Sequence, residues 1–371
     1  MTPSRAFEIF LTAPPGLELI LKAEALEQGF AKPKAMPGGV RFRGKWQDVW
    51  RANLCLRGAG RVLVRVARFQ AMHLDQLEAR TREVDWRGLL RPDVPVTVNA
   101  TCRKSKIYHQ GAAAERVARA VQEVTGCPAG DTDAIRLLLR IEDNQCTLSV
   151  DTSGALLHKR GYKEAVGKAP MRETLAALFL RDCGYRGDDT VLDPMCGSGS
   201  FVIEAAEMAA GLAPGRGRSF AFQRLATFDA QAWAALQGEV QAAHTNLIFH
   251  GRDRDAGAIE AATTNAARAG VADLTRFDCC PISDLSRPDG PPGLVIVNPP
   301  YGARIGNRKQ LFGLYAGFGA VMKTRFSGWR VGLVTTDPGL ARATGLPFAP
   351  PGPPVAHGGL KVRLWQTGPL A

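Results

Sequence analysis

The sequence predicts an α/β protein in which a doubly wound sheet follows a smaller α+β region. The prediction depends on how apolar runs are spaced along the 371 residues. From about residue 170, short apolar runs alternate with helical stretches of about a dozen residues, which is typical of parallel strands joined by helices. Before residue 155, strands and helices are mixed without that alternation, which is typical of an α+β fold.

The α+β region is expected to span residues 1–155. Apolar residues occupy every second position at Phe7, Ile9 and Leu11, as in a strand with one buried face. A Pro-Pro-Gly turn at 14–16 leads into a helix, and Gly29 is placed to end that helix. The other expected strands are 38–44, 61–70, 94–101 and the two arms of a hairpin within 134–154, and the other expected helices are 46–54 and 111–126.

The doubly wound domain is expected over residues 181–371, after a linker helix region at 156–180. The helix of that linker is predicted from the amphipathic run 172–185. The expected strands of the domain are 190–195, 246–255, 274–280, 292–300, 328–336 and 357–368, and its expected helices are 197–211, 256–270 and 311–326. Ligands of such sheets bind at the carboxyl ends of the strands, so the residues that follow each strand are the candidate site.

Composition indicates a folded protein outside the membrane. Hydrophobic residues make up 45% of the chain, enough to form buried cores. No apolar run reaches the roughly 18 residues of a membrane span, and the first residues lack the apolar middle of a signal peptide, so a cytoplasmic location without membrane partners is expected. The eight cysteines are scattered without a CxxC pair or a flanking histidine cluster, so no metal site is expected.

The basic charge of the chain is concentrated in its first half. The formal net charge is +12, and residues 1–168 contribute +9 of it, with 27 Lys and Arg against 18 Asp and Glu. Such an excess indicates a surface that meets a polyanion. On composition alone, a basic protein kept soluble by its charge is an equally good interpretation.

A glycine-containing loop follows the first strand of the doubly wound domain. The stretch "LDPMCGSGSF" contains Asp193, Pro194, Cys196, Gly197, Ser198 and Gly199. The two glycines allow backbone amides to approach a ligand, and the next helix points its positive end at the loop. The spacing is neither a P-loop nor a three-glycine dinucleotide fingerprint. Asp193 would repel a pyrophosphate and attract a cation such as the ammonium group of an amino acid.

Carboxylates also end the next two strands. Asp253 and Asp255 follow the second strand, where an acidic side chain accepts the hydroxyls of a ribose. Asp278 ends the third, where it can accept the amino group of an adenine. Each aspartate alone is more simply a helix cap. Ammonium, ribose and adenine sites in this order together predict S-adenosylmethionine as the cofactor.

The fourth strand ends in "NPPY", which we predict to be catalytic. Two prolines fix the backbone, so the Asn298 side-chain oxygen and the Pro299 carbonyl can face the site. Together with Pro300, which has no N–H to donate, they form a cluster of acceptors suited to an exocyclic amine that attacks a methyl group. Tyr301 offers a face on which a flipped base can stack. The alternative is a proline-rich turn that leaves a strand.

These motifs resemble those of class I S-adenosylmethionine-dependent methyltransferases that act on exocyclic amines. The segments "TAPPGLELILKAEALEQGF", "SKIYHQGAAAERVARAV" and "SVDTSGALLHKRGYKEAVGKAPMRETLAALFL" resemble enzymes that join a THUMP domain to such a methyltransferase. The resemblance covers nearly the whole chain and is closest to the guanine-N2 methyltransferases of bacterial 23S ribosomal RNA. It implies a Rossmann-like methyltransferase domain, with an N-terminal ferredoxin-like plus THUMP region that binds structured RNA.

The resemblance also implies roles for individual residues. It assigns Asp193, Gly197 and Gly199 to methionine, Asp253, with or without Asp255, to ribose, Asp278 to adenine and 298–301 to catalysis, with Asn298 also beside the cofactor. Two clusters that mix basic and aromatic residues fit phosphate contact and stacking, and we predict that they bind RNA: Arg103, Lys104 and Lys106, beside Tyr108 and His109, in one, and His158, Lys159, Arg160 and Tyr162 in the other. A solvated loop is the simpler interpretation of each, and Arg160 can equally be a structural arginine.

Several other functions remain open from the sequence. A tRNA guanine-N2 methyltransferase shares the motifs, and an adenine-N6 or a protein-glutamine methyltransferase shares the NPPY chemistry. A non-catalytic RNA-binding protein would not need the intact Asp193 loop, and a nicotinamide-dependent oxidoreductase is disfavoured by its two-glycine spacing. The sequence does not indicate the oligomeric state, and a monomer is the simplest expectation.

Overall fold

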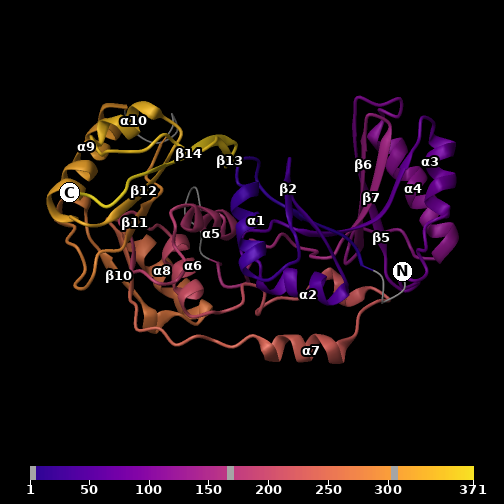
Figure 1. Ribbon diagram of the computed structural model, residues 1–371, viewed down its shortest axis with the longest axis horizontal. Helices are drawn as coiled ribbons and strands as arrows, with labels where there is room; N and C mark the ends of the chain where they lie inside the picture. Colours follow the sequence, from indigo (N-terminus) through magenta and orange to yellow (C-terminus); the bar gives the residue numbers. More distant parts are fainter. Residues whose placement is uncertain (1–5, 165–170, 302–307) are drawn as a thin grey trace. The chain divides into compact units, whose positions relative to one another are not determined.

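The structure is a computed structural model that describes residues 6–164, 171–301 and 308–371 (Figure 1). Contacts divide the chain into two compact units. Unit 1 contains Met1–Ala13, Lys22–Leu157 and Arg218–Glu239, and unit 2 contains Pro14–Leu21, His158–Gly217 and Val240–Ala371. The domain limits proposed from the sequence stay predictions, and residues 165–170 of the expected linker lie outside the described residues.

Unit 1 is built on a seven-stranded sheet with the strand order β2-β3-β1-β4-β7-β6-β5. Its strands are β1 (Phe7–Thr12), β2 (Lys34–Met36), β3 (Gly39–Gly44), β4 (Val62–Gln70), β5 (Val96–Arg103), β6 (Ile135–Glu142) and β7 (Gln145–Asp151). The helices that accompany them are α1 (Glu18–Glu27), which straddles the two units, α2 (Trp46–Cys55), α3 (Leu74–Arg82), α4 (Gln110–Thr125) and α7 (Ala230–Glu239), with the short η1 (Ala221–Arg224). Neighbouring strands are antiparallel except for the parallel pair β5 and β6.

One face of this sheet is more deeply buried than the other. Along β1, Phe7, Ile9 and Leu11 are buried, whereas Glu8 and Phe10 between them are only half-buried. The same alternation runs along β6, where every second side chain from Ile135 is buried. Because successive side chains of a strand point to opposite faces, the buried set forms the core and the less buried set lies on the other face.

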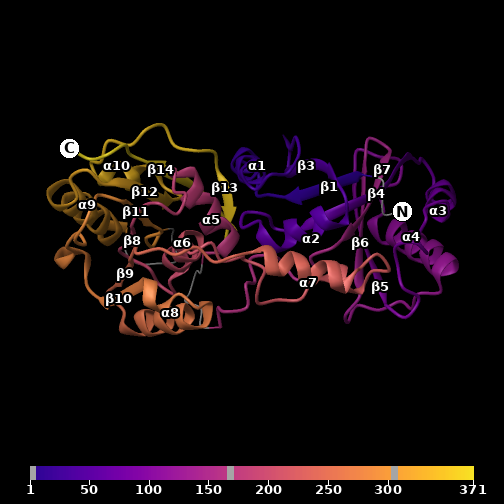
Figure 2. The same ribbon diagram turned by 60° about the horizontal axis from the view of Figure 1, so that its bottom comes forward.

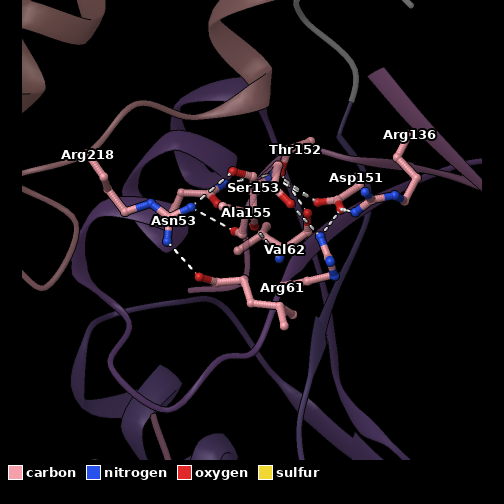
Figure 3. Close-up of polar contacts among 11 residues, drawn as sticks. Asn53, Arg61, Val62, Arg136, Asp151, Thr152, Ser153, Ala155 and Arg218 are labelled. Carbon is pink, nitrogen blue, oxygen red and sulfur yellow. Dashed lines mark hydrogen bonds and ion pairs between the residues drawn. The ribbon is translucent and has the colours of Figure 1, made fainter. Parts of the chain in front are cut away.

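A network of polar contacts holds the end of β7 in unit 1 (Figure 3). The buried Asp151 carboxylate pairs with Arg61 and Arg136 and accepts hydrogen bonds from the backbone amides that follow it. The Ser153 hydroxyl accepts from Val62 N at 2.8 Å and donates to Asn53 Oδ1 at 2.6 Å. The Arg218 guanidinium donates to the carbonyls of Ser153, Ala155 and Leu156, which fixes its own segment to this unit. The network satisfies polar groups that burial would otherwise leave unpaired.

Several ion pairs join helices α3 and α4, and the one buried carboxylate among them predicts an acid-sensitive contact. Glu78 on α3 has a buried side chain that accepts from Arg119 at 2.5 Å, from Arg116 at 2.7 Å and from Arg82. The hydrogen bonds from Arg119 and Arg116 lower the pKa of Glu78 to about 2. The stabilisation is therefore complete above the pKa of an unfolded glutamate and is lost as the pH falls towards 2.

We expect Glu78→Gln to lower the melting temperature of the full chain by a few degrees at pH 6. The difference between variant and wild type should shrink as the pH is lowered from 5 to 2.5, because the glutamate becomes protonated in the unfolded state over that range while the native carboxylate stays largely ionised. Scanning calorimetry at several pH values measures both. Glu83→Gln, at a more exposed ion pair with Arg80, is the control and should have little effect. A Glu78→Gln difference that is constant across this range contradicts the account.

Unit 2 is built on the doubly wound sheet that the sequence predicts. Its strand order is β10-β9-β8-β11-β12-β14-β13. The strands are β8 (Val191–Asp193), β9 (Phe249–Asp253), β10 (Thr275–Cys279), β11 (Leu294–Val297), β12 (Arg330–Thr335), β13 (Val355–His357) and β14 (Leu360–Gln366). The helices are α5 (Glu173–Asp182), α6 (Ser200–Ala209), α8 (Ala256–Ala269), α9 (Arg308–Arg325) and α10 (Pro338–Ala343), with the short η2 (Ala272–Leu274) and η3 (Ile282–Asp284).

The strand order of this sheet contains a switch point between two of its inner strands. β8 to β12 are parallel, β14 runs antiparallel to β12, and β13 at the edge runs antiparallel to β14. Helices α6 and α8 lie on one side of the sheet and α9 and α10 on the other (Figures 1 and 2). The chain order reverses between β8 and β11, and such a switch point opens a crevice at the carboxyl ends of the strands.

Candidate active site

The carboxyl edge of the unit 2 sheet gathers the residues proposed from the sequence. Asp193 ends β8, Asp253 ends β9, Asp278 is the second-to-last residue of β10 and Asn298 directly follows β11. Pairing of β8 with β9 and with β11 sets these strand ends side by side. The sheet therefore brings the loop, the strand-end carboxylates and the NPPY segment to one edge.

The loop after β8 requires glycine at two positions. Gly197 and Gly199 have φ angles of +51° and +84°, which side chains with a Cβ rarely adopt. A Cβ on Gly199 would lie 3.1 to 3.3 Å from Ile203, Ala262 and Phe277, whereas a Cβ on Gly197 would meet no atom within 4 Å. Gly199 is thus packed against the protein, and Gly197 faces open space in which a ligand can approach the backbone.

Asp193 is a buried carboxylate with few contacts that offset the cost of burying its charge. Its side chain accepts a hydrogen bond from Met195 N at 3.1 Å, and it is only 2% exposed. Among the residues that the structure describes, no basic side chain forms an ion pair with it. Burial, reinforced by the Asp253 carboxylate, raises the pKa of Asp193 well above its usual range. A bound cation would offset this cost, so the residue fits an ammonium group.

Asp253, the last residue of β9, and Asp255, two residues further on, make different contacts. Asp253 accepts from Gly197 N at 3.0 Å and from Asp255 N at 3.0 Å, so it links the end of β9 to the glycine loop. Asp255 is the N-cap of α8, because its side chain accepts from Gly257 N at 2.9 Å and Ala258 N at 3.4 Å. The geometry therefore favours Asp253 over Asp255 as the residue that faces a ligand at the loop.

Asp278 is paired across the sheet with a residue that the sequence analysis did not single out. Its carboxylate lies 2.6 Å from Arg252 Nη1, and the two residues are register partners on β10 and β9. The Asp278 side chain is 62% exposed. The assignment of Asp278 to adenine stays a prediction. A ligand amino group bound there would contact a carboxylate that is also paired with Arg252.

Gly251 is a second position that the sequence analysis missed. A Cβ on this residue of β9 would lie 2.4 Å from the Phe277 ring and 3.0 Å from Cys196 Sγ. The Phe277 ring therefore packs against the backbone of β9 at Gly251, where no side chain is in the way, and it also lies next to Gly199. A glycine inside a strand signals such a close approach, and that signal was present in the sequence.

The segment after β11 presents an unpaired acceptor. Asn298 Oδ1 is buried and has no hydrogen-bond partner within the described part of the chain. The Pro300 carbonyl accepts from the hydroxyl of Tyr315, on α9, at 3.3 Å, and this contact fixes the proline turn. Tyr301 packs partly buried against the core of the unit, and burial raises its pKa to about 12. Tyr315 is thus a supporting residue that no local motif revealed.

The predicted RNA-binding residues fall into exposed and buried groups. In unit 1, Arg103, Lys104 and Lys106 are exposed at the end of β5 and after it. In unit 2, Lys159 is exposed and His158 is half-buried, and burial lowers the pKa of His158 to about 4.

Arg160 and Tyr162 are corrected by the structure. The Arg160 side chain is 2% exposed and pairs with Glu204 of α6 at 3.4 Å. Tyr162 is 5% exposed, and burial raises its pKa well above the usual value. Because neither side chain reaches the surface, neither can lie against an RNA. Arg160 instead has the structural role that the sequence left open.

The described residues contain neither a membrane-spanning helix nor a metal-binding cluster. No helix within 6–164, 171–301 and 308–371 is both long and apolar enough to cross a membrane. In the same ranges, no group of three or more His, Cys, Asp and Glu side chains is arranged to hold a metal ion.

Two protein families match the chain. The family described as "RMKL-like, methyltransferase domain" matches residues 160–347, and the family described as "RlmL ferredoxin-like domain" matches residues 8–63. Among curated proteins, a ribosomal RNA large subunit methyltransferase K/L from Syntrophotalea carbinolica is 38% identical over 360 residues. The match covers 91% of this chain and 50% of that protein. The chain spans about half the length of the curated relatives it matches.

Solved structures share the whole fold. A predicted N6-adenine-specific DNA methylase from Listeria monocytogenes is 32% identical with a TM-score of 0.89, and the match covers 98% of this chain and 97% of that one. A candidate methyltransferase complexed with SAH is 26% identical with a TM-score of 0.90, and the match covers 99% of each chain.

Proposed function

Because the chain belongs to the RMKL-like methyltransferase family, we propose that it transfers a methyl group from S-adenosylmethionine to the exocyclic N2 amine of a guanine in large-subunit ribosomal RNA. S-adenosylmethionine is the cofactor of this family of methyltransferases. The observation that carries the proposed chemistry is the buried Asn298 Oδ1, which has no partner in the described ranges and lies at the same sheet edge as the glycine loop. A cytoplasmic location, where ribosomal RNA is made and assembled in bacteria, follows from the proposal.

The residues at the sheet edge fit the parts of the cofactor. The Asp193 carboxylate would hold the ammonium group of the methionine portion, and the open backbone at Gly197 would lie against the ligand. Asp253 would accept the ribose hydroxyls. The cofactor supplies an electrophilic methyl group on a sulfonium sulfur. The rest of the chemistry depends on how the protein holds the amine.

Asn298 and Pro299 would orient the amine and accept its protons. The lone pair of a guanine amine is delocalised into the ring, so the amine is a weak nucleophile. Hydrogen bonds from its two protons to Asn298 Oδ1 and the Pro299 carbonyl would favour a pyramidal nitrogen and stabilise the charge that develops on it. Tyr301 offers a face for the extruded base, and Tyr315 holds the turn through the Pro300 carbonyl. No covalent enzyme intermediate is needed.

The choice of ribosomal RNA is supported by the curated relatives and by charge. The relatives from Syntrophotalea carbinolica and Marinobacter nauticus are named large-subunit ribosomal RNA methyltransferases. The first 168 residues carry a net charge of +9, which suits a nucleic-acid partner. Exposed Arg103, Lys104, Lys106 and Lys159 remain candidate contacts, with half-buried His158 beside Lys159. A guanine-N2 target in tRNA would use the same site.

An adenine-N6 target is the second candidate. One solved relative is named as a predicted N6-adenine-specific DNA methylase, and the Asn298 acceptors suit an adenine amine equally well. Glutamine methylation of a protein is less favoured, because the basic half suits a polyanion.

A methylation assay with different classes of substrate tests the proposal. The purified chain is incubated with labelled S-adenosylmethionine and with unmodified ribosomal RNA, tRNA, DNA or protein extract, and the products are digested and analysed by mass spectrometry. We expect N2-methylguanosine in large-subunit ribosomal RNA. N6-methyladenosine supports the second candidate instead. Label found only in protein, or in no product, overturns the assignment to RNA.

The different contacts of Asp253 and Asp255 predict different effects of substitution. Asp253→Asn retains an acceptor for Gly197 N but loses the charge, and it should weaken S-adenosylmethionine binding by about tenfold. Asp255→Ala should leave that affinity unchanged but lower the free energy of unfolding by about 0.5–2 kcal/mol, because α8 loses its cap. Titration calorimetry and urea unfolding measure the two effects. The reverse pattern would assign the ribose to Asp255.

A further inference from the structure

A groove lined by arginines crosses the more exposed face of the unit 1 sheet. It has a volume of about 500 Å³ and is lined by four arginines, Arg41, Arg65, Arg68 and Arg140, which we call the arginine groove. Phe10, Gln70, Gln145 and Thr147 lie between them. A second cavity of about 400 Å³ shares Arg41 and adds Lys32, Lys34 and Arg43. None of these residues belongs to the two clusters that the sequence suggested as RNA contacts.

Strand register explains why these arginines share one face. Arg68 is opposite Thr147 on β7, and Thr147 is opposite Arg140 on β6, so the three side chains form a row across the sheet. On the other side, Arg41 is opposite Phe10. Arg65 and Arg68 are three residues apart and would point to opposite faces of a regular strand. A register shift between Arg65 and Ala67 removes that alternation and puts both on the groove.

The groove has a surplus of positive charge. Across the two cavities, seven basic side chains line the surface against the three acidic side chains of Glu8, Glu142 and Asp143. Glu8 pairs with both Arg41 and Arg65, and Glu142 pairs with Arg140 at 2.6 Å. Arg68 is exposed and forms no ion pair with any described residue. The acidic side chains of the groove therefore neutralise only part of its positive charge, and a bound anion can pair with the remaining basic side chains.

An aromatic ring lies within this charged surface. The Arg65 guanidinium lies over the Phe10 ring, 4.4 Å from its centroid, and Phe10 is half-buried. Aromatic rings and guanidinium planes are the surfaces on which unpaired bases of RNA stack, while arginine forks bind phosphate oxygens in pairs. A protein partner would need a run of acidic side chains to match the arginines and would leave the stacking surface unused.

We propose that the arginine groove binds the sugar–phosphate backbone of the RNA substrate, with an unpaired base against Phe10 and Arg65. This inference rests on the proposed function, because it takes RNA as the substrate. It assigns RNA capture to the sheet face of unit 1. Arg103 lies opposite Glu142 in the β5 and β6 pairing, so the exposed Arg103 cluster continues the same surface. Phosphate contacts on this face position the RNA and do not read its bases.

The test compares two double variants that remove the same charge. Arg68→Ala with Arg140→Ala changes the groove, and Arg80→Ala with Arg91→Ala removes two exposed arginines of unit 1 that line neither cavity. Binding of a fluorescent fragment of unmodified large-subunit ribosomal RNA is measured by anisotropy over a range of salt concentrations. Binding of S-adenosylmethionine and the melting temperature report whether each variant is folded.

We expect the groove variant to bind RNA at least about tenfold more weakly and to reduce the slope of log K against log salt by about 1 to 2, because phosphate contacts release counterions. The control variant should match the wild type, and both should bind S-adenosylmethionine normally. A groove variant with unchanged RNA affinity and salt slope overturns the inference, while methylation of RNA by the wild type would keep the proposed function intact. A wild type that neither binds nor methylates RNA overturns both. Binding of polyglutamate in place of RNA, lost in the groove variant, would assign the groove to an acidic protein.

Discussion

Replacing Asn298 by alanine is expected to lower the rate of methyl transfer by about a hundredfold or more, the size of effect seen when an enzyme loses one preorganised contact to a developing charge. The reason is the position of Asn298 Oδ1, which directly follows β11, is buried and has no partner among the described residues. A buried acceptor without a donor costs free energy, so a site that keeps one gains from a substrate that supplies the donor. The amine protons of the target base are such donors.

The experiment separates chemistry from binding. Single-turnover rates at saturating S-adenosylmethionine and RNA measure the methyl-transfer step, and calorimetry measures cofactor affinity, which should stay near that of the wild type. Tyr315→Phe is a useful comparison, because it loses the hydroxyl that donates to the Pro300 carbonyl and should give a smaller decrease. An unchanged single-turnover rate for Asn298→Ala would remove this residue from the mechanism.

Replacing Asp193 by asparagine is expected to weaken S-adenosylmethionine binding by about tenfold to a hundredfold, the range for loss of one charged hydrogen bond. Asparagine keeps the size of the side chain and an acceptor for Met195 N. Because the buried carboxylate has no ion pair with a described residue, removing its charge should not lower the free energy of unfolding. A loss of affinity without a loss of stability would identify a ligand contact.

The raised pKa of Asp193 adds a pH signature to this prediction. In the free protein, burial favours the protonated carboxyl, whereas a bound ammonium group favours the ionised one. S-adenosylmethionine affinity should therefore increase with pH until Asp193 is ionised in the free protein, and Asp193→Asn should flatten that dependence. Calorimetry at several pH values measures both profiles. An asparagine variant with normal affinity, or with the same pH profile as the wild type, contradicts the ammonium assignment.

The positions of the main candidate residues could be predicted because they follow from strand order. Apolar runs before Asp193, Asp253 and Asn298 identify buried strands, and parallel strands align their carboxyl ends. The capping role of Asp255 was also within reach, since an aspartate directly before a helical run favours an N-cap.

The remaining features depend on contacts between distant parts of the chain. Nothing in the run "HKRGY" shows that Arg160 pairs with Glu204, 44 residues away, so a basic and aromatic cluster could not be told from a buried ion pair. The register shift after Arg65 follows from how β4 pairs with β7, and a sequence pattern does not show it. The arginine groove could therefore not be predicted from the sequence, because it depends on which strands pair and in which register.

A crystal structure of the full chain with bound SAH tests the central claim most directly. The account predicts the ligand at the carboxyl edge of the unit 2 sheet, with its amino group within about 3 Å of Asp193 and its ribose hydroxyls on Asp253. Asn298 Oδ1 should remain open beside the sulfur for the incoming amine. Ligand density away from the Gly197 loop, or a carboxyl edge closed by side chains, would contradict the assignment of this edge as the methyl-transfer site.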